Sequence, residues 1–364
     1  MSEKPLRYIQ IKELIIHDIR QLPPHTRLPS RTALADKYKA ARTTIERAIS
    51  ELIGEKYLYA RDGSGTYVAE VSGKSSAHLS NPIFGLVIPN IMHDTYPGIL
   101  RGVEDVANEH GMNVVLCNTD NKVDKESAYI QKLIHSDVKG VIIVPAIIGK
   151  TNMNSFQKLE EASIPMVFCN RGIDGVSAPR VISNNFYGAY LSVKHLIATG
   201  RQRIAYISRP LYSTSNDRYQ GYISALTEAN MEQQSDYVIF ESSFNGDLQG
   251  YKSAKQLLSL DPAPDALFCF NDAIAKGAYD AVTEAGLQVG EDIGIVGYDN
   301  THVAERLPVK LTSVKFQTYD IGKQAAEWLV RMINKETLQE NKTVVLQPEL
   351  IIRQSTQPQT VTHK

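Results

Sequence analysis

Cysteine, tryptophan and long apolar runs are scarce in this chain of 364 residues. The three cysteines, each at the end of a short apolar run, are too few for a disulfide framework and indicate buried thiols in a reducing compartment. No stretch reaches the roughly 18 consecutive apolar residues of a membrane span. Charges interrupt the N-terminal segment, where a secretory signal would lie. We therefore expect a soluble, cytoplasmic protein with no membrane partner.

The chain also lacks the motifs of common enzyme classes. It has no G-x-G-x-x-G segment after the first strand of the expected sheet, no phosphate-loop lysine motif, no G-x-S-x-G segment and no Cys or His spacing suited to zinc. Its nine histidines are scattered, and residues such as His78 and His195 are more simply explained as surface or site-lining groups. We expect no catalytic residue, no cofactor and no metal site.

The net charge is small but unevenly distributed. The whole chain carries 39 Lys and Arg against 40 Asp and Glu, whereas residues 1–74 contain 13 basic and 9 acidic side chains, a net charge of +4. The rest of the chain therefore carries −5. A basic head on a larger acidic body suggests that the head meets a polyanion such as DNA, although a plain solvated domain often carries the same charge.

The first part of the chain shows three helical stretches. Apolar residues at helical spacing predict a first helix from Tyr8 to about Leu22, and Ser30 is a candidate N-cap for a second helix. A third helix is expected from about Arg42, and its apolar spacing leaves Arg47 on the solvent side of the first two turns. In a helix-turn-helix, this is the part of the recognition helix that reaches base edges.

Two short strands are expected after the third helix. Alternating residues over 57–61 and 66–69 flank the segment Asp62-Gly63-Ser64-Gly65. Its glycines permit the positive φ that a hairpin turn needs, and backbone at such a tip can approach a phosphate or the minor groove closely. The pattern therefore predicts a winged helix-turn-helix over residues 1–70.

This pattern resembles the DNA-binding domain of GntR-type transcription regulators. The resemblance rests on the segments LPS at 28–30, ARTTIERA at 41–48 and DGSGTYV at 62–68, in that order. It implies contacts with the phosphates and bases of double-stranded operator DNA. The candidate DNA-binding residues are Arg7, Ser30, Arg31, Arg42, Thr43, Thr44, Arg47, Gly63, Ser64 and Gly65. Taken singly, each could also be a solvated charge, a helix cap or a turn residue.

A small, polar segment at 71–82 ends in proline and is expected to be a linker. After it, short apolar runs alternate with amphipathic stretches. Strands are expected at 83–88, 112–117, 141–144, 165–169, 203–207, 237–240, 266–270 and 293–296, and helices at 98–110, 123–136, 153–162, 187–199, 215–229, 247–259 and 272–285. This alternation predicts parallel sheets that helices cover on both faces.

A break in the alternation at 172–179 suggests that the body, residues 83–356, forms two doubly wound parallel-sheet lobes. We expect lobe 1 at about 83–175 and 310–335, and lobe 2 at about 180–308 and 340–356. Ligands of such sheets bind beyond the carboxyl ends of the strands. The fold class is therefore α/β with an N-terminal winged helix-turn-helix, and the cleft between the lobes is the expected ligand site.

Polar side chains follow most of the expected strands, with aromatic and imidazole groups nearby. These candidates are Asn90, His93, Tyr96, Asp120, Arg171, Asp272 and Asp299. Carboxylates, amides and guanidinium groups beside flat apolar rings are what recognition of a sugar's vicinal hydroxyls requires. Asp and Asn after strands are also ordinary turn and cap residues, so the prediction depends on their meeting in one cleft.

The body resembles the effector-binding domain of LacI/GalR regulators, a relative of periplasmic sugar-binding proteins. The segments that carry the resemblance are VISNNFYGAYLSVKHLIATGRQRIAYIS, DRYQGYISAL, FCFNDAIAKGAYDAVTEAGLQVGEDIGIVGYDN and LTSVK. The resemblance implies a fold like type I periplasmic binding proteins and a homodimer formed through the body. The ligand contacts that it implies are Arg171, Asn184 or Asn185, Arg218, Asp272 and, as a further candidate, Asp299.

A GntR-type head on a LacI-type body is similar to the domain combination of the arabinose-operon repressors of Gram-positive bacteria. This resemblance implies a repressor that a pentose-type sugar such as L-arabinose releases from its operator. The alternative is a solute-binding or sugar-modifying α/β protein that carries an incidental DNA-binding fusion. A protein of this alternative kind would bind no DNA duplex more tightly than it binds random DNA.

Overall fold

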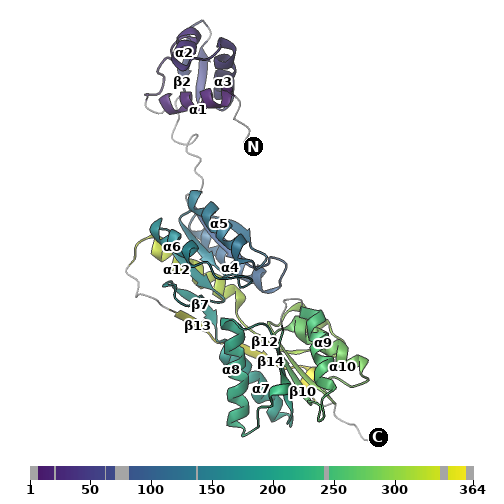
Figure 1. Ribbon diagram of the computed structural model, residues 1–364. Coiled ribbons are helices and arrows are strands. Elements are labelled where there is room, and N and C mark those ends of the chain that lie inside the picture. Colours follow the sequence, from purple (N-terminus) through teal and green to yellow (C-terminus); the bar gives the residue numbers. More distant parts are fainter. Residues whose placement is uncertain are drawn as a thin grey trace. The chain divides into compact units, whose positions relative to one another are not determined.

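The computed structural model describes residues 7–19, 22–61, 63–69, 82–136, 138–241, 246–336 and 343–357. The chain divides into two compact units, Met1–Asn81 and Pro82–Lys364, and Figure 1 shows the first in purple. The expected linker at 71–82 lies, apart from Pro82, outside the described residues, as does Asp62 of the expected turn. Within the described residues, no helix has the length and apolar character needed to cross a membrane.

The N-terminal unit packs three helices and a hairpin around one apolar core. Its elements are α1 (Arg7–Ile19), α2 (Arg31–Tyr38), α3 (Arg42–Gly54), β1 (Leu58–Arg61) and β2 (Gly65–Val68). Ile11 and Ile15 of α1 share this buried core with Ile45 and Ile49 of α3. The hydroxyl of Ser30 accepts the N–H of Ala33 at 3.2 Å, so Ser30 is the N-cap of α2, as predicted.

The first helix was expected to reach about Leu22, but that residue lies outside it. Leu22 is exposed, and its N–H donates to the carbonyl of Ile19 at 3.1 Å in a turn. Pro23 and Pro24 follow directly. Because the residue before a proline avoids the helical conformation, the apolar side chain of Leu22 does not extend the helix.

The hairpin has the expected form of a wing. Strands β1 and β2 are antiparallel, and their last pair is Arg61 with Gly65. Gly63 and Gly65 have φ values of +70° and +127°, which only glycine adopts readily. The N–H of Leu28 donates to the carbonyl of Thr66 at 2.8 Å, so the segment before α2 is hydrogen-bonded to the wing.

The first lobe of the body is a six-stranded parallel sheet. Its strands, in spatial order, are β13 (Thr343–Leu346), β7 (Arg180–Ser183), β6 (Met166–Cys169), β5 (Gly140–Ile143), β3 (Ile83–Ile88) and β4 (Asn113–Asn118). Its helices are α4 (Thr95–Glu109), α5 (Val123–His135), α6 (Met153–Glu161) and α12 (Thr318–Ile333). Phe84 and Leu86 of β3 pack with α4 and α12, whereas Val87 packs with α5 and α6, so helices cover both faces.

The second lobe repeats this architecture with one antiparallel edge strand. Its strands, in spatial order, are β14 (Glu349–Ile351), β12 (Thr312–Lys315), β11 (Gly294–Tyr298), β10 (Ala266–Cys269), β8 (Ile204–Ser208) and β9 (Val238–Phe240), with β14 antiparallel to β12. Its helices are α7 (Asn185–Ala198), α8 (Ser213–Glu228), α9 (Gly246–Leu258), α10 (Asp272–Glu284) and α11 (His302–Arg306), with single turns at Ser235–Tyr237 and Gln354–Thr356. Figure 1 shows α7 and α8 on one side of this sheet and α9 and α10 on the other. The α/β fold class and the two sheets are thus as predicted, except for the antiparallel edge strand β14.

The structure corrects the expected division of the body between the lobes. Residues 180–183, expected in lobe 2, form β7 and pair with β6 of the first sheet. No strand was expected at 312–315 or 343–346: the first of these segments, expected in lobe 1, forms β12 of the second sheet, and the second, expected in lobe 2, forms β13 and pairs with β7. The apolar pattern of a short strand is the same whichever sheet it joins, so the pattern alone did not place these crossings.

The chain crosses between the lobes three times, after β7, after β12 and after β13. Hydrogen bonds join the crossings: the side-chain N–H of Asn184 donates to Gln347 Oε1 at 3.1 Å, and that of Gln317 donates to the carbonyl of Gln347 at 2.7 Å. A few residues at the ends of packed elements are the usual form of a hinge between two rigid bodies. We therefore describe Asn184, Gln317 and Gln347 as the hinge.

Candidate functional site

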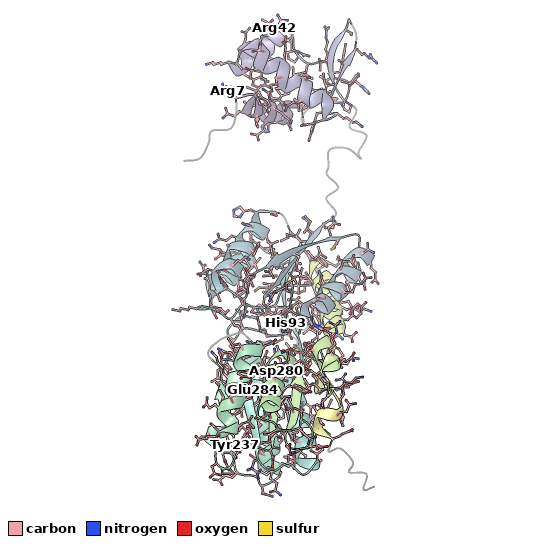
Figure 2. All side chains as sticks on the ribbon, turned by 90° about the vertical axis from the view of Figure 1, so that its right-hand side faces the viewer. Arg7, Arg42, His93, Tyr237, Asp280 and Glu284 are labelled. Carbon is pink, nitrogen blue, oxygen red and sulfur yellow. The ribbon has the colours of Figure 1, made fainter. Side chains whose placement is uncertain are left out.

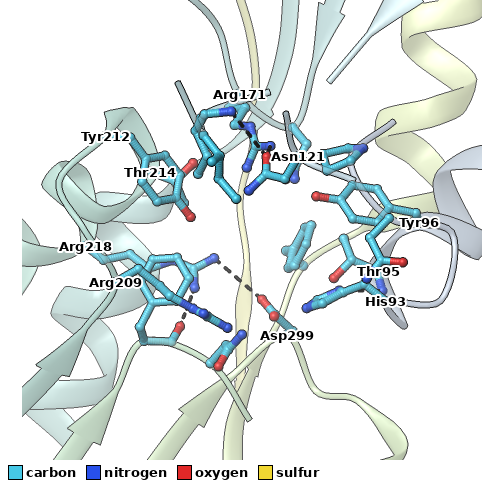
Figure 3. Close-up of a pocket in the computed structure, with 18 of the residues that line it drawn as sticks. His93, Thr95, Tyr96, Asn121, Arg171, Arg209, Tyr212, Thr214, Arg218 and Asp299 are labelled. Atoms are coloured by element: carbon cyan, nitrogen blue, oxygen red, sulfur yellow. Dashed lines mark hydrogen bonds and ion pairs between the residues drawn. The ribbon is translucent and has the colours of Figure 1, made fainter. Parts of the chain in front are cut away.

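A cavity of about 270 Å³ lies between the two lobes of the body. Segments after β3, β4, β5 and β6 line it from the first lobe, and segments after β8, β10 and β11 line it from the second. Phe316, at one of the crossings, lines it as well, and Figure 3 shows its side chains in close-up. The cavity is therefore at the carboxyl ends of both sheets, where ligands of parallel α/β sheets bind.

Seven of the nine predicted effector-site residues line this cavity. They are Asn90, His93, Tyr96, Asp120, Arg171, Arg218 and Asp299. Asn185 and Asp272 do not line it. The structure thus brings most of the candidates together, although they lie far apart in the sequence.

Asp272 is completely buried at the start of α10 and does not line the cavity, so its contact with a ligand stays a prediction. Its carboxylate accepts the hydroxyl of Ser313 at 2.6 Å and both the N–H and the hydroxyl of Thr301, at 2.6 and 3.0 Å. Burial and the nearby carboxylate of Asp299 raise the pKa of Asp272 to about 7. Its position after a strand was foreseen, but its side chain points into the lobe and ties α10 to β12.

Arg218 of α8 is held by contacts on several sides. Its Nε–H donates to Asn185 Oδ1 at 3.0 Å, a terminal N–H donates to the carbonyl of Phe270, and a terminal nitrogen lies 3.5 Å from Asp299 Oδ1. The guanidinium also lies over the ring of Tyr298, 3.4 Å from its centroid. Asn185 therefore positions Arg218 from behind the cavity wall, and its own contact with a ligand stays a prediction.

Arg171 approaches the cavity from the first lobe. Its Nε–H donates to the carbonyl of Pro145 at 2.6 Å, and a terminal N–H donates to Asn121 Oδ1 at 3.0 Å. The guanidinium lies 5.5 Å from the ring centroid of Tyr212, which belongs to the second lobe. Arg171 thus contacts both lobes.

The cavity includes lining residues that the sequence patterns did not single out. They include Asn121, Ile147, Ile148, Arg209, Thr214 and Phe270. Arg209 is only 7% exposed, and burial lowers its pKa. Arg209 directly follows β8. We looked mainly for Asp and Asn after strands, and a search for any polar residue directly after a strand would have found it.

Two side chains pair across the cleft in addition to the hinge. The carboxylate of Asp94, just before α4 of the first lobe, lies within hydrogen-bond distance of Nδ1 of His302, at the start of α11 in the second lobe. The His302 and Asp94 side chains are 53% and 36% exposed. Because solvent screens such a pair, it contributes only about 0.2–1 kcal/mol to holding the lobes together.

In the N-terminal unit, most of the predicted DNA-binding residues lie at the surface, and Figure 2 labels two of them, Arg7 and Arg42. The exposed members are Arg7, Ser30, Arg42, Thr43, Arg47, Gly63 and Gly65, and the half-buried ones are Arg31, Thr44 and Ser64. They come from α1, the N-cap and first residue of α2, the start of α3 and the wing.

Some of these residues also have contacts within the unit. Arg31 donates to the hydroxyl of Thr66 at 3.0 Å and so ties α2 to the wing. Arg47 lies over the ring of Tyr8, 3.9 Å from its centroid. Arg42 donates from Nε to Glu46 Oε1 at 3.1 Å, with both side chains at least half exposed. The last contact is weak and leaves the Arg42 guanidinium accessible.

The described residues contain no group of three or more His, Cys, Asp or Glu side chains that could hold a metal ion. Cys117, Cys169 and Cys269 are buried free thiols. Burial raises the pKa of the Cys169 thiol to about 12, which keeps it protonated.

Family models match both units of the chain. The model described as bacterial regulatory proteins of the gntR family matches residues 7–68, and the periplasmic binding protein-like domain matches residues 193–356. An arabinose metabolism transcriptional repressor from Geobacillus stearothermophilus is 30% identical over 98% of this chain and 99% of its own length. The chain belongs to the GntR/LacI-type family of transcriptional repressors.

Other relatives of this repressor agree with that assignment. A ribose operon repressor from Halalkalibacterium halodurans is 30% identical over 89% of this chain and 97% of its own length. The crystal structure of the transcription regulator CcpA of Lactococcus lactis matches 76% of this chain and 99% of that chain with a TM-score of 0.69 and 30% identity. These relatives are regulators, so the repressor belongs to a non-enzymatic class.

Each lobe of the repressor holds a buried carboxyl group behind the cavity wall. In the first lobe, Glu126 of α5 accepts the N–H of Ala146 at 2.7 Å, next to the lining residues Ile147 and Ile148. Burial raises the pKa of Glu126 to about 7, as it does for Asp272 in the second lobe. The folded protein therefore retains protons on these groups at a pH where ordinary carboxyl groups are ionised.

Because these carboxyl groups keep their protons in the folded protein, its stability should depend on pH. Between about pH 5 and 7, folded Glu126 holds a proton that the unfolded chain has released, so the free energy of unfolding should fall as the pH rises, by up to about 1.4 kcal/mol per pH unit for this group. In Glu126→Gln, the amide oxygen still accepts from Ala146, and this part of the dependence should vanish. Urea unfolding, followed by the fluorescence of Trp328 in the body, measures both proteins. An identical pH dependence would show that folded Glu126 is ionised.

Proposed function

We propose that this protein is a cytoplasmic repressor that binds operator DNA as a homodimer and that a pentose-type sugar such as L-arabinose releases it. The observation that carries the proposal is the polar cavity between two hinged lobes, in a chain whose other unit presents an exposed helix of the recognition type. The first feature supports reversible binding of a small ligand, and the second supports DNA reading.

The surface of α3 supports DNA reading. In helix-turn-helix proteins, the N-terminal residues of the recognition helix contact base edges in the major groove. Arg42 and Thr43 are the first residues of α3, and both are exposed. Arg42 can exchange its weak, exposed pairing with Glu46 for a guanine or a phosphate at little cost. The backbone at Gly63 and Gly65 can meanwhile approach a phosphate.

The cavity supports a sugar as the effector. Its volume of about 270 Å³ is near the lower end of ligand pockets, about 300–1,000 Å³, which suits a monosaccharide. Arg218 and Asp299 offer donors and acceptors for vicinal hydroxyls, and the rings of Tyr212 and Phe270 offer flat apolar faces. The relatives named for arabinose metabolism and for a ribose operon favour a five-carbon sugar.

The hinge allows sugar binding in the body to change DNA binding by the N-terminal units. A sugar that contacts both lobes favours the lobe orientation in which those contacts are complete. In a homodimer formed through the body, a change of lobe orientation alters the spacing of the two recognition helices. Half-sites on a near-palindromic operator lie about 34 Å apart, so a few ångströms of displacement weaken simultaneous binding.

The central prediction concerns operator release. The full-length protein should bind a duplex from the DNA upstream of its own gene with a Kd of about 10⁻⁸ M or below. The effector sugar should weaken this binding about 5- to 150-fold, the usual range of allosteric coupling. Fluorescence anisotropy with and without L-arabinose or D-ribose measures both values. Binding no tighter than to random duplex at moderate salt would favour the solute-binding alternative instead.

A second prediction separates the two sites. Arg42→Ala should weaken specific DNA binding by about 1–3 kcal/mol because it removes a base or phosphate contact, while sugar affinity stays unchanged. Arg101→Ala is the matched control, since Arg101 is an exposed helical arginine in the body with the same i,i+4 acidic pairing. Anisotropy and calorimetry measure the two affinities. Equal loss of both in Arg42→Ala would assign this residue a structural role.

A further inference from the structure

Two neighbouring residues of the cavity wall hold an unusual backbone conformation. Asp120 and Asn121, in the segment after β4, have φ values of +52° and +61°, in the left-handed region that residues other than glycine seldom adopt. Asn tolerates this region better than most side chains, but two such residues in succession are costly. Strained backbone of this kind gathers at ligand sites, where surrounding contacts hold it. The contacts of this segment therefore stabilise a conformation that the chain would not hold alone.

Asn121 joins the strand ends of the first lobe that line the cavity. Its N–H donates to the carbonyl of Pro89 at 3.0 Å, and its carbonyl accepts the N–H of Ile148 at 2.9 Å. Its side-chain Oδ1 accepts the N–H of Ile147 at 3.2 Å and a terminal N–H of Arg171 at 3.0 Å. These partners follow β3, β5 and β6, so one residue after β4 holds the first-lobe side of the cavity wall together.

The two donors that meet Oδ1 fix the orientation of the Asn121 amide. The backbone N–H of Ile147 and the guanidinium of Arg171 can only donate, so the atom between them is the carbonyl oxygen and not the NH2 group. The Nδ2 atom then carries two N–H donors. Within the part of the chain that the structure describes, Nδ2 donates no hydrogen bond, and it is accessible rather than enclosed. Because Asn121 lines the cavity, these donors are available to a ligand.

Arg171 adds further donors beside this amide. A guanidinium has five N–H groups, and those that donate to Pro145 and Asn121 are only part of the five. Figure 3 shows Arg171 beside Asn121, with the hydrogen bond between them drawn as a dashed line. The lone pairs of a ligand oxygen satisfy such donors, whereas an apolar group leaves them unpaired. A ligand oxygen is therefore the atom that fits this part of the wall.

We infer that Asn121 binds the effector and helps to set its specificity: Nδ2 donates to one hydroxyl oxygen of the sugar, while Oδ1 positions Arg171 beside that oxygen. The inference rests on the proposed function and names a contact residue of its site. A site that hydrogen-bonds a hydroxyl group rejects analogues that lack it, because its own polar groups then stay unpaired. Removal of the hydroxyl that faces Asn121 should therefore weaken binding.

Isothermal titration calorimetry compares the full-length protein with its Asn121→Asp variant, with L-arabinose, D-ribose and the monodeoxy forms of each as probes. The aspartate keeps an acceptor oxygen for Ile147 and Arg171 but has no N–H, so the tighter-binding sugar should bind the variant about tenfold more weakly. The monodeoxy form that lacks the facing hydroxyl should bind both proteins equally, because that contact is already absent. Asn108→Asp, at an exposed position of α4, adds the same charge and should leave every affinity unchanged.

A purely positioning role for Asn121 would give a different result. An aspartate would hold the guanidinium of Arg171 at least as firmly as the amide does, so the sugar would keep its affinity and no monodeoxy form would stand out. That result overturns the inference. Asn121→Gly suits the left-handed backbone but removes both side-chain functions, so it should weaken sugar binding more than Asn121→Asp does. Thermal unfolding without ligand monitors the folding of each variant.

These outcomes are distinguishable from a failure of the proposed function. If a pentose releases the operator and binds the native protein and Asn121→Asp equally, the repressor function stands and the role of Asn121 is wrong. If neither sugar binds the native protein, the sugar effector and the inference are both overturned. If the calorimetry gives the expected pattern but the protein binds no duplex specifically, the inference is supported and the repressor function fails.

Discussion

The carboxyl ends of two parallel sheets meet across one cavity because three short crossings join the lobes, and the rest of the structure depends on this constraint. Gln347, at one crossing, is hydrogen-bonded to Asn184 and Gln317 at the other two. Residues that follow strands of either lobe therefore line the same space. A ligand in that space contacts both lobes at once, and the lobes can change their relative orientation by adjusting a few backbone dihedrals at the crossings.

The energies involved explain why a small ligand can control such a body. Outside the hinge, the lobes are joined by contacts such as that between Asp94 and His302, about 0.2–1 kcal/mol, and the cation–π contact of Arg171 with Tyr212, about 0.5–2 kcal/mol. A typical coupling free energy between an effector and a distant site is about 1–3 kcal/mol. These values are of the same size, so a few hydrogen bonds from a bound ligand to each lobe suffice to decide the preferred orientation.

Much of this architecture could be predicted from the sequence, because short-range patterns determine it. The spacing of Ile45, Ile49 and their neighbours fixed the buried face of α3, and the runs at 83–88 and 266–270 correspond closely to β3 and β10. The strands β7, β12 and β13 were not among the expected strands, and the residues that form them were assigned to the wrong lobe. A crossing depends on which sheet offers an open edge, and that is a property of the assembled lobes.

Asp272 and Arg209 both lie just after a strand of the second lobe, but their side chains point in different directions, and this difference has an electrostatic consequence. Spacing along the chain places a residue after a strand, but it does not say whether the side chain points into the cavity or into the lobe. Asp272 points inward to Ser313 and Thr301, and its pKa of about 7 leaves it only partly ionised near neutral pH. Arg209 lines the cavity. The inward carboxyl group removes a negative charge from the lining and the arginine adds a positive one, so side-chain direction sets the charge that a ligand meets.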